Sequence, residues 1–204
     1  MQSAFGIIKT MKNSNIIHHP RFARDGKSVA FTPAVLAKVH ALILRYPEGQ
    51  QKSALLPVLH IAQEELGGYL SVDAMDYVAT LLGIQPIEVY EVATFYSMFY
   101  LEKMGKYVIE VCRTGPCAIS GGEKILAHLQ EVLEIKPGET TPDGVFTLKE
   151  VECLGSCGTG PVMQVNSEYY EKLTPGKVDK LIEDFREYAN RNKPGGLSWV
   201  EKFC

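Results

Sequence analysis

The chain has 204 residues, of which 46% are hydrophobic and 22% are charged, a composition typical of a soluble globular protein. Its net charge of -3 gives no attraction to nucleic acid or anionic membranes, and no apolar run reaches the roughly 18 to 20 residues needed to span a bilayer. Four of the five cysteines are clustered and no secretory signal is evident, so we expect metal ligands rather than a disulfide framework.

Residues 1–30 are expected to form an extended N-terminal arm, because they show no sustained hydrophobic period and are rich in Asn, His, Lys and Arg. The first acidic residue is Asp25, which gives a faint similarity to a mitochondrial transit segment. His18 and His19 are interpreted as solvated surface histidines rather than as metal ligands.

Residues 31–104 carry the pattern of four short amphipathic helices joined by tight turns, which predicts a four-helix bundle. Caps and prolines start these helices and glycines end them: Thr32-Pro33, Ser71 and Gln85-Pro86 at the starts, and Gly49, Gly67-Gly68 and Gly83 at the ends. The second helix is expected from about Ser53 to Leu66, with Pro57 at its start or at a kink.

The fourth helix is expected to continue through residues 89–100, which are dense in aromatic side chains. Phe95 and Tyr96 are interpreted as core residues. One helix face cannot bury every aromatic of this stretch in so small a domain. Others are therefore expected to contact the second domain or a partner.

Residues 105–189 change to a mixed pattern of strands and helices. An alternating stretch from Tyr107 predicts a strand that ends at Cys112, and Ser120 with Glu123 predicts a capping box for the helix that follows. Strands over 145–152 and 162–165, a hairpin turn and a final helix complete an order close to the C-terminal part of thioredoxin. The predicted fold is α+β: a helical bundle, a thioredoxin-like α/β domain, and an irregular tail over 190–204.

Two cysteine pairs lie where predicted strands end, Cys112 with Cys117 as C-x4-C and Cys153 with Cys157 as C-x3-C. Two such loops at the same edge of a sheet can converge on a single site. A [2Fe–2S] site with four thiolates is anionic, so the loops must supply hydrogen-bond donors. Glycines would let backbone N–H groups approach the sulfurs, namely Gly115, Gly155, Gly158 and Gly160.

Other uses of these cysteines are less consistent with the spacing. Structural zinc usually takes C-x2-C pairs, and a thioredoxin-type redox site needs C-x-x-C, which is absent here. Unrelated core cysteines would not need flanking glycines. Spacing alone leaves a [4Fe–4S] cluster open. Cys204, in the tail, is interpreted as a free thiol.

With these residues in view, the chain resembles the thioredoxin-like [2Fe–2S] ferredoxin subunits (the E-type subunits) of respiratory complex I, the NADH:quinone oxidoreductase. The resemblance covers roughly residues 31–190. It rests on RYPEG, LLPVLHIAQ, YEVATFYSMF, VCRTGPC, ETTPDGVFTLKEVECLGSCGTGP and NSEYYEKLTP.

Carried over residue by residue, the family's cluster ligands fall on Cys112, Cys117, Cys153 and Cys157. The resemblance implies an electron-transfer subunit whose cluster exchanges one electron with the FMN of an NADH-oxidising partner. That partner also bears a [4Fe–4S] cluster, and a neighbouring iron–sulfur subunit completes the peripheral arm. FMN and NADH are expected on the partner, since this chain has no G-x-G-x-x-G loop.

The resemblance also implies that the isolated chain is not catalytic and meets the membrane only through the complex. Its expected location is the cytoplasmic side of an inner membrane, or the mitochondrial matrix. Related subunits of NAD-linked hydrogenases and formate dehydrogenases leave the parent enzyme open. The competing class is a thioredoxin-like binding module stapled by zinc, without a redox role.

Overall fold

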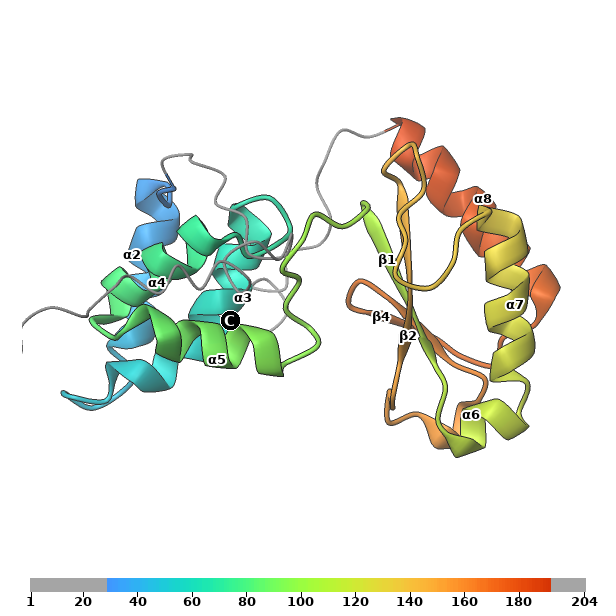
Figure 1. The fold of residues 1–204 in the computed structure, drawn as a ribbon, viewed down its shortest axis with the longest axis horizontal. Coiled ribbons are helices and arrows are strands. Elements are labelled where there is room, and N and C mark those ends of the chain that lie inside the picture. The colour runs from blue at the N-terminus through green and yellow to red at the C-terminus, as the bar shows by residue number, and fades with distance from the viewer. Residues whose placement is uncertain (1–28, 192–204) are drawn as a thin grey trace, which may run out of the picture. The chain divides into compact units, whose positions relative to one another are not determined.

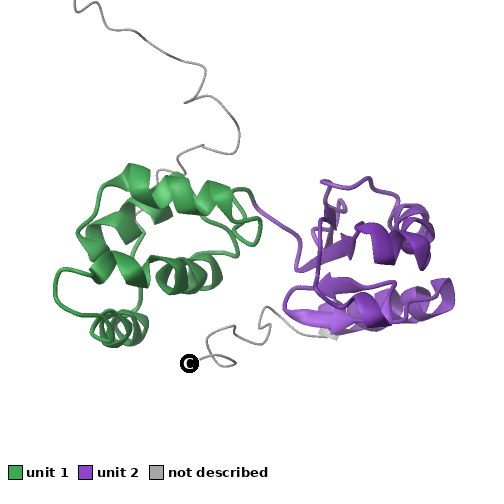
Figure 2. Ribbon diagram, turned by 90° about the horizontal axis from the view of Figure 1, so that it is seen from below, with its two compact units in different colours: residues 1–102 green, residues 103–204 purple. Residues whose placement is uncertain are grey.

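The computed structural model describes residues 29–191 (Figure 1). His18, His19, Cys204, nearly all of the expected arm and most of the expected tail lie outside the described residues. The chain divides into two compact units that meet in the sequence between Glu102 and Lys103 (Figure 2). Within residues 29–191, none of the helices combines the length and the hydrophobicity that a membrane crossing requires.

In the described part of the first unit, every secondary-structure element is a helix. It contains α2 (Pro33–Ile43), a 3-10 turn η2 (Gln51–Ala54), α3 (Leu55–Glu65), α4 (Val72–Leu82) and α5 (Pro86–Phe95). Two helix starts follow the expected capping chemistry. The Thr32 hydroxyl accepts the Val35 N–H at 3.4 Å, and the Ser71 hydroxyl accepts the Ala74 N–H at 3.2 Å.

The end of α5 departs from the expectation of a helix through residue 100, because Tyr96 already has an extended backbone. The Gln63 side chain on α3 holds the following turn: its oxygen accepts the Tyr100 N–H at 2.6 Å, and its amide group donates to the Met98 carbonyl at 3.1 Å. Phe95 is 80% exposed and Tyr96 38%, so their assignment to the core was wrong. The turn directs Phe99 inward instead, where it is 5% exposed.

The second unit is built on a four-stranded sheet with the order β2-β1-β3-β4. Its strands are β1 (Tyr107–Cys112), β2 (Phe146–Val151), β3 (Met163–Val165) and β4 (Glu168–Tyr170). β1 is parallel to β2 and antiparallel to β3. Asn166, with a φ of 55°, makes the tight turn of the β3–β4 hairpin, as the sequence predicts.

One face of this sheet is covered by α7 (Gly122–Leu133) and α8 (Pro175–Arg191) (Figure 1). The apolar core lies between the sheet and these two helices, and alternate residues of β1 enter it. Its buried members are Tyr107, Ile109, Val111, Ile125, Leu129, Leu133, Ile135, Phe146, Leu148, Met163, Val165, Leu173, Val178 and Ile182.

The connection from β1 to β2 decides where the cysteines lie. Parallel strands need a crossover, and α7 provides it, so β1 and β2 end at the same edge of the sheet. Cys112, the last residue of β1, is in register with Val151, the last residue of β2. Cys153 follows only two residues later. The two cysteine loops therefore start side by side.

Candidate metal centre

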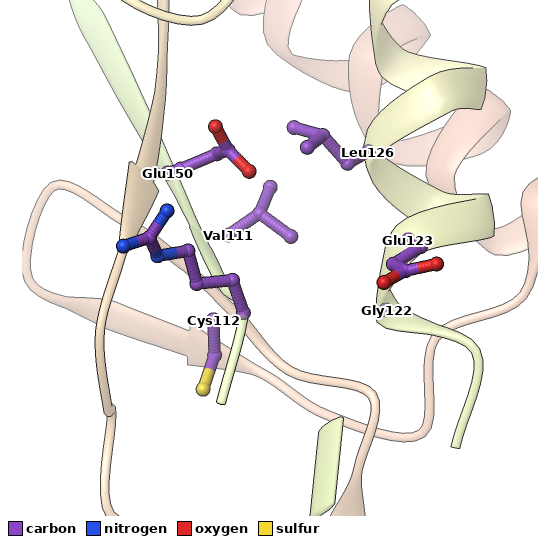
Figure 3. Close-up of a pocket in the computed structure, with 7 residues that line it drawn as sticks. Val111, Cys112, Gly122, Glu123, Leu126 and Glu150 are labelled. Carbon is purple, nitrogen blue, oxygen red and sulfur yellow. The ribbon is translucent and has the colours of Figure 1, made fainter. Parts of the chain in front are cut away.

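Cys112 is the last residue of β1, and its side chain lies on the sheet face opposite the helices. Side chains alternate along a strand, so Val111 enters the core below α7 while the Cys112 side chain leaves on the other side. Figure 3 shows this at a small pocket lined by Val111, Leu126 and Glu150 among others, with the Cys112 sulfur directed away from Leu126. Cys112 is 3% exposed.

Cys117 lies on α6 (Gly115–Ile119), a short helix between β1 and α7. It is 2% exposed and forms a small cluster with Cys112 and Val162, against which Leu154 packs. A β-carbon on Gly160 would lie 3.1 Å from the Ser120 hydroxyl oxygen and 3.6 Å from the Cys117 sulfur, so the Gly160 backbone packs closely on the end of α6 beside the thiol. The first cysteine pair is thus assembled and shielded from water.

The expected capping box of Ser120 and Glu123 is absent at the start of α7, where the N-cap is Gly121 without a side-chain cap. The Ser120 hydroxyl instead donates to the Pro116 carbonyl at 2.6 Å. The reason is that α6 precedes α7 and uses Ser120 as its own C-terminal residue. The prediction took one helix where the chain forms two.

Hydrogen bonds from both cysteine loops converge on the Cys112 sulfur. Burial raises the pKa of this thiol, but the Thr114 hydroxyl at 3.3 Å and the N–H groups of Leu154 and Thr114 together lower it below its ordinary value. Leu154 belongs to the second loop, and the Cys112 sulfur also lies 3.5 Å from the Glu152 carbonyl oxygen. The Arg113 guanidinium bonds the Glu152 carboxylate at 3.1 Å and so ties the two loops at the surface.

Cys117 has the opposite shift. Burial and the interaction with Cys112 raise its pKa, while the N–H of Val162 opposes that rise. The proximity of Cys157 raises it further. A buried pair of adjacent sulfurs that both face backbone N–H groups suits anionic sulfur ligands.

Cys153 and Cys157 are exposed, unlike the first pair. The Cys153 sulfur accepts the Gly155 N–H at 3.4 Å, in a turn where Gly155 has a φ of 75°. Cys157 begins the 3-10 turn η3 (Cys157–Thr159). Within residues 29–191, no three or more His, Cys, Asp or Glu side chains are grouped to hold a metal ion. The second pair thus lies at the edge of the first without closing on it.

The N–H donors around the sulfurs were only partly evident from the sequence. Of the expected glycines, Gly155 donates to a sulfur and Gly160 packs against one. Thr114, Leu154 and Val162 supply further N–H groups, which the sequence does not distinguish from any others. The glycine pattern predicted loops that bend round sulfur, but not which N–H points at it.

The chain is similar in sequence to known proteins over most of its described length. The family described as Thioredoxin-like [2Fe-2S] ferredoxin matches residues 39–186. A protein of Rickettsia typhi, named as the E-type subunit of NADH-quinone oxidoreductase, is 46% identical over 156 residues, which cover 76% of this chain and 92% of that protein. A Dictyostelium discoideum protein named NADH dehydrogenase [ubiquinone] flavoprotein 2, mitochondrial, is 43% identical over 164 residues, covering 80% of this chain and 65% of that one.

A solved structure of an NAD+-reducing [NiFe]-hydrogenase in its H2-reduced state resembles the chain with a TM-score of 0.60. The identity is 24%, and the match covers 74% of this chain. It spans about a quarter of the hydrogenase chain, 24% of its length. At this identity the likeness concerns the fold.

Proposed function

The chain belongs to the thioredoxin-like [2Fe-2S] ferredoxin family, and from this premise we propose that it is the electron-transfer subunit of an NADH:quinone oxidoreductase. The observation that carries the proposal is the convergence of both cysteine loops on the Cys112 sulfur, through the Leu154 N–H and the Glu152 carbonyl. The names of the two relatives at 43% and 46% identity support the choice of parent enzyme.

We propose that Cys112, Cys117, Cys153 and Cys157 hold one [2Fe–2S] cluster. The donor set fits such a group, because two thiols are already adjacent and buried and the other two start from the same sheet edge. When bound, the cluster supplies reversible one-electron transfer.

The protein's own residues prepare this site in two ways. Val162 and Leu154 pack on the buried thiols and exclude water from them. The N–H groups of Thr114, Leu154 and Val162 face the sulfurs and offset negative charge there. Hydrogen bonds to cluster sulfurs are among the features that set a reduction potential. Arg113 is neutralised by Glu152, so the cationic side chain adds little net charge at the rim.

The proposed electron partner is the FMN of an NADH-oxidising subunit that also carries a [4Fe–4S] cluster. We propose that the four helices within residues 31–104 contact that subunit, and that a neighbouring iron–sulfur subunit completes the peripheral arm. The domain of residues 105–189 carries the cluster. The chain is one part of an oxidoreductase, located at the inner membrane on its cytoplasmic side, or on the matrix side in mitochondria.

The corresponding subunit of an NAD-linked hydrogenase or formate dehydrogenase would share this fold. The hydrogenase likeness concerns the fold alone, whereas the relatives above 40% identity carry the quinone oxidoreductase name. A zinc-stapled binding module would use the same four cysteines without redox chemistry.

The deciding test counts iron, zinc and acid-labile sulfide in the purified full chain and records an electron paramagnetic resonance spectrum after dithionite reduction. A spin-half signal with about two irons per chain is expected for a reduced [2Fe–2S] cluster. One zinc per chain and a silent spectrum would overturn the proposal in favour of the zinc-stapled module.

A further inference from the structure

The carboxylate of Glu171, which lies outside the cysteine loops, holds the turn that carries Cys157 through hydrogen bonds. Glu171 follows β4, and a single oxygen of its side chain accepts hydrogen bonds from the hydroxyls of Ser156 and Thr159, the latter at 2.7 Å. The two hydroxyl oxygens are themselves 2.7 Å apart. Ser156 precedes Cys157 and Thr159 ends its 3-10 turn, so Glu171 holds the turn on both sides of the cysteine.

The backbone reinforces the same attachment. The Lys172 N–H donates to the Thr159 carbonyl at 2.7 Å, and the Leu173 N–H donates to the Pro161 carbonyl at 3.1 Å. Leu173 is buried in the core between the sheet and its helices. The Cys157 turn is therefore fastened to the segment 171–173, which is itself anchored in the core.

Cys157 needs such support more than the buried cysteines do. It is exposed, and its turn contains Gly158 and lies between Gly155 and Gly160, which leave the free loop many conformations. Charged acceptors form stronger hydrogen bonds than neutral ones. The Ser156 and Thr159 hydroxyls lower the pKa of Glu171, so their hydrogen bonds favour its charged carboxylate.

We propose that Glu171 is a positioning residue that presents Cys157 to the cluster, an inference that rests on the proposed function. Partners that orient metal ligands typically contribute about 10- to 100-fold to metal affinity or activity. Glu171 acts through Ser156 and Thr159 and does not itself coordinate iron.

Four variants separate positioning from charge. Glu171→Ala removes the acceptor and the charge, and Glu171→Gln removes the charge but keeps an acceptor oxygen. Glu183→Ala removes an equal charge from the exposed side of α8, outside this hydrogen-bond group. Ser156→Ala is a second route to the same loss, because it deletes one of the two donors and leaves Glu171 in place.

The measurement is the rate at which the iron-loaded full chain loses its visible absorbance to a chelator, together with its paramagnetic resonance line shape at matched iron content. We expect Glu171→Ala to lose the cluster about 10- to 100-fold faster with an altered line shape. Ser156→Ala should change in the same direction. Glu171→Gln should fall between wild type and Glu171→Ala, because it keeps an acceptor oxygen but loses the charge that strengthens the hydrogen bonds. Glu183→Ala should be indistinguishable from wild type.

Two results would overturn the inference while leaving the proposed function intact. One is a wild-type rate and line shape in Glu171→Ala. The other is an equal change in Glu171→Ala, Glu171→Gln and Glu183→Ala, which would indicate charge alone. A wild-type chain that binds zinc or no metal would instead overturn the proposed function, and the inference with it. Far-ultraviolet circular dichroism of each variant verifies that the fold is retained.

Discussion

The Cys112 thiol donates to the carbonyl oxygen of Glu152 at 3.5 Å, so the last residue of β1 touches the residue that immediately precedes Cys153. These two residues are 40 positions apart in the chain. Their contact follows from the parallel pairing of β1 with β2, in which Cys112 is in register with Val151. Two cysteine pairs that are distant in sequence thereby share one edge of a sheet.

The proposed ligand set makes a direct prediction about Cys153. Cys153→Ser should lose or severely weaken the cluster, because an alcohol is a poor replacement for a thiolate ligand of iron. Iron content and visible absorbance of the purified chain measure the loss. Cys204→Ser is the matched control and should leave both unchanged. Bleaching by Cys204→Ser would show that the ligand set is wrong.

Replacing Gly122 by a residue with a side chain is expected to lower the stability of the fold, for a steric reason. A β-carbon there would lie 2.8 Å from the Cys117 carbonyl oxygen and 3.2 Å from that of Cys112. Gly122→Ala should lower the free energy of unfolding by about 1–3 kcal/mol, since backbone atoms must move to admit the methyl group. Urea unfolding of the metal-free chain measures it.

Gly176→Ala on α8 is the control for that substitution. A β-carbon at Gly176 meets nothing within 4 Å, and less backbone entropy is then lost on folding. We expect unchanged stability or a gain of up to about 1 kcal/mol. Equal losses in Gly122→Ala and Gly176→Ala would contradict the steric explanation.

Gln63 is predicted to hold the turn after α5. Gln63→Ala removes the bonds to the Tyr100 N–H and the Met98 carbonyl, each worth about 0.5–1.5 kcal/mol. Hydrogen exchange of the amide of Tyr100 should accelerate, and urea unfolding should show the lost stability. Gln50→Ala, at an exposed glutamine of the same unit, should change neither. An unchanged exchange rate in Gln63→Ala would rule out this role.

Asp143 gives a prediction about pH. The Thr141 hydroxyl and the Val145 N–H, the latter at 2.9 Å, bond its carboxylate and lower its pKa from the ordinary value of 3.8. A lowered native pKa stabilises the fold above the unfolded value, and this contribution is lost as pH falls through the native pKa. The stability difference between wild type and Asp143→Asn should therefore be full at pH 7 and shrink below about pH 3.8.

Urea unfolding of wild type and Asp143→Asn at several pH values between 7 and 2.5 measures that difference. The turn that holds Asp143 leads directly into β2. When Asp143 is protonated and this turn loosens, the first group affected should be the Phe146 N–H, which donates to the Thr141 hydroxyl at 3.0 Å. A stability difference that does not vary with pH would contradict the role of the charged carboxylate.

Local signals in the sequence predicted much of the fold. Thr32 and Ser71 start helices because each caps an N–H three residues ahead, a bond that needs no distant partner. The alternation after Tyr107 and the turn at Asn166 are equally local. The placement of the two cysteine loops at one sheet edge could also be predicted, because both follow strands that are parallel neighbours. The four-cysteine ligand set itself stays a prediction.

The misassigned residues share a different property, since their positions depend on partners far along the chain. Tyr96 leaves the helix where Gln63 takes up the next backbone groups, and nothing in residues 89–100 encodes that glutamine. Ser120 matched a capping box locally, yet the packing of α6 against α7 gave it another role.

The sequence by itself determined which residues are candidate sulfur ligands, where most helices and strands begin, and which family the chain resembles. These depend on residue chemistry and on bonds between near neighbours. Only the tertiary structure decided that Leu154 bonds Cys112, that Cys157 is exposed, and that Glu171 grips its turn. Each of these depends on the distance between segments that meet only after the sheet has formed, because hydrogen bonds act over about 3 Å whatever the separation in sequence.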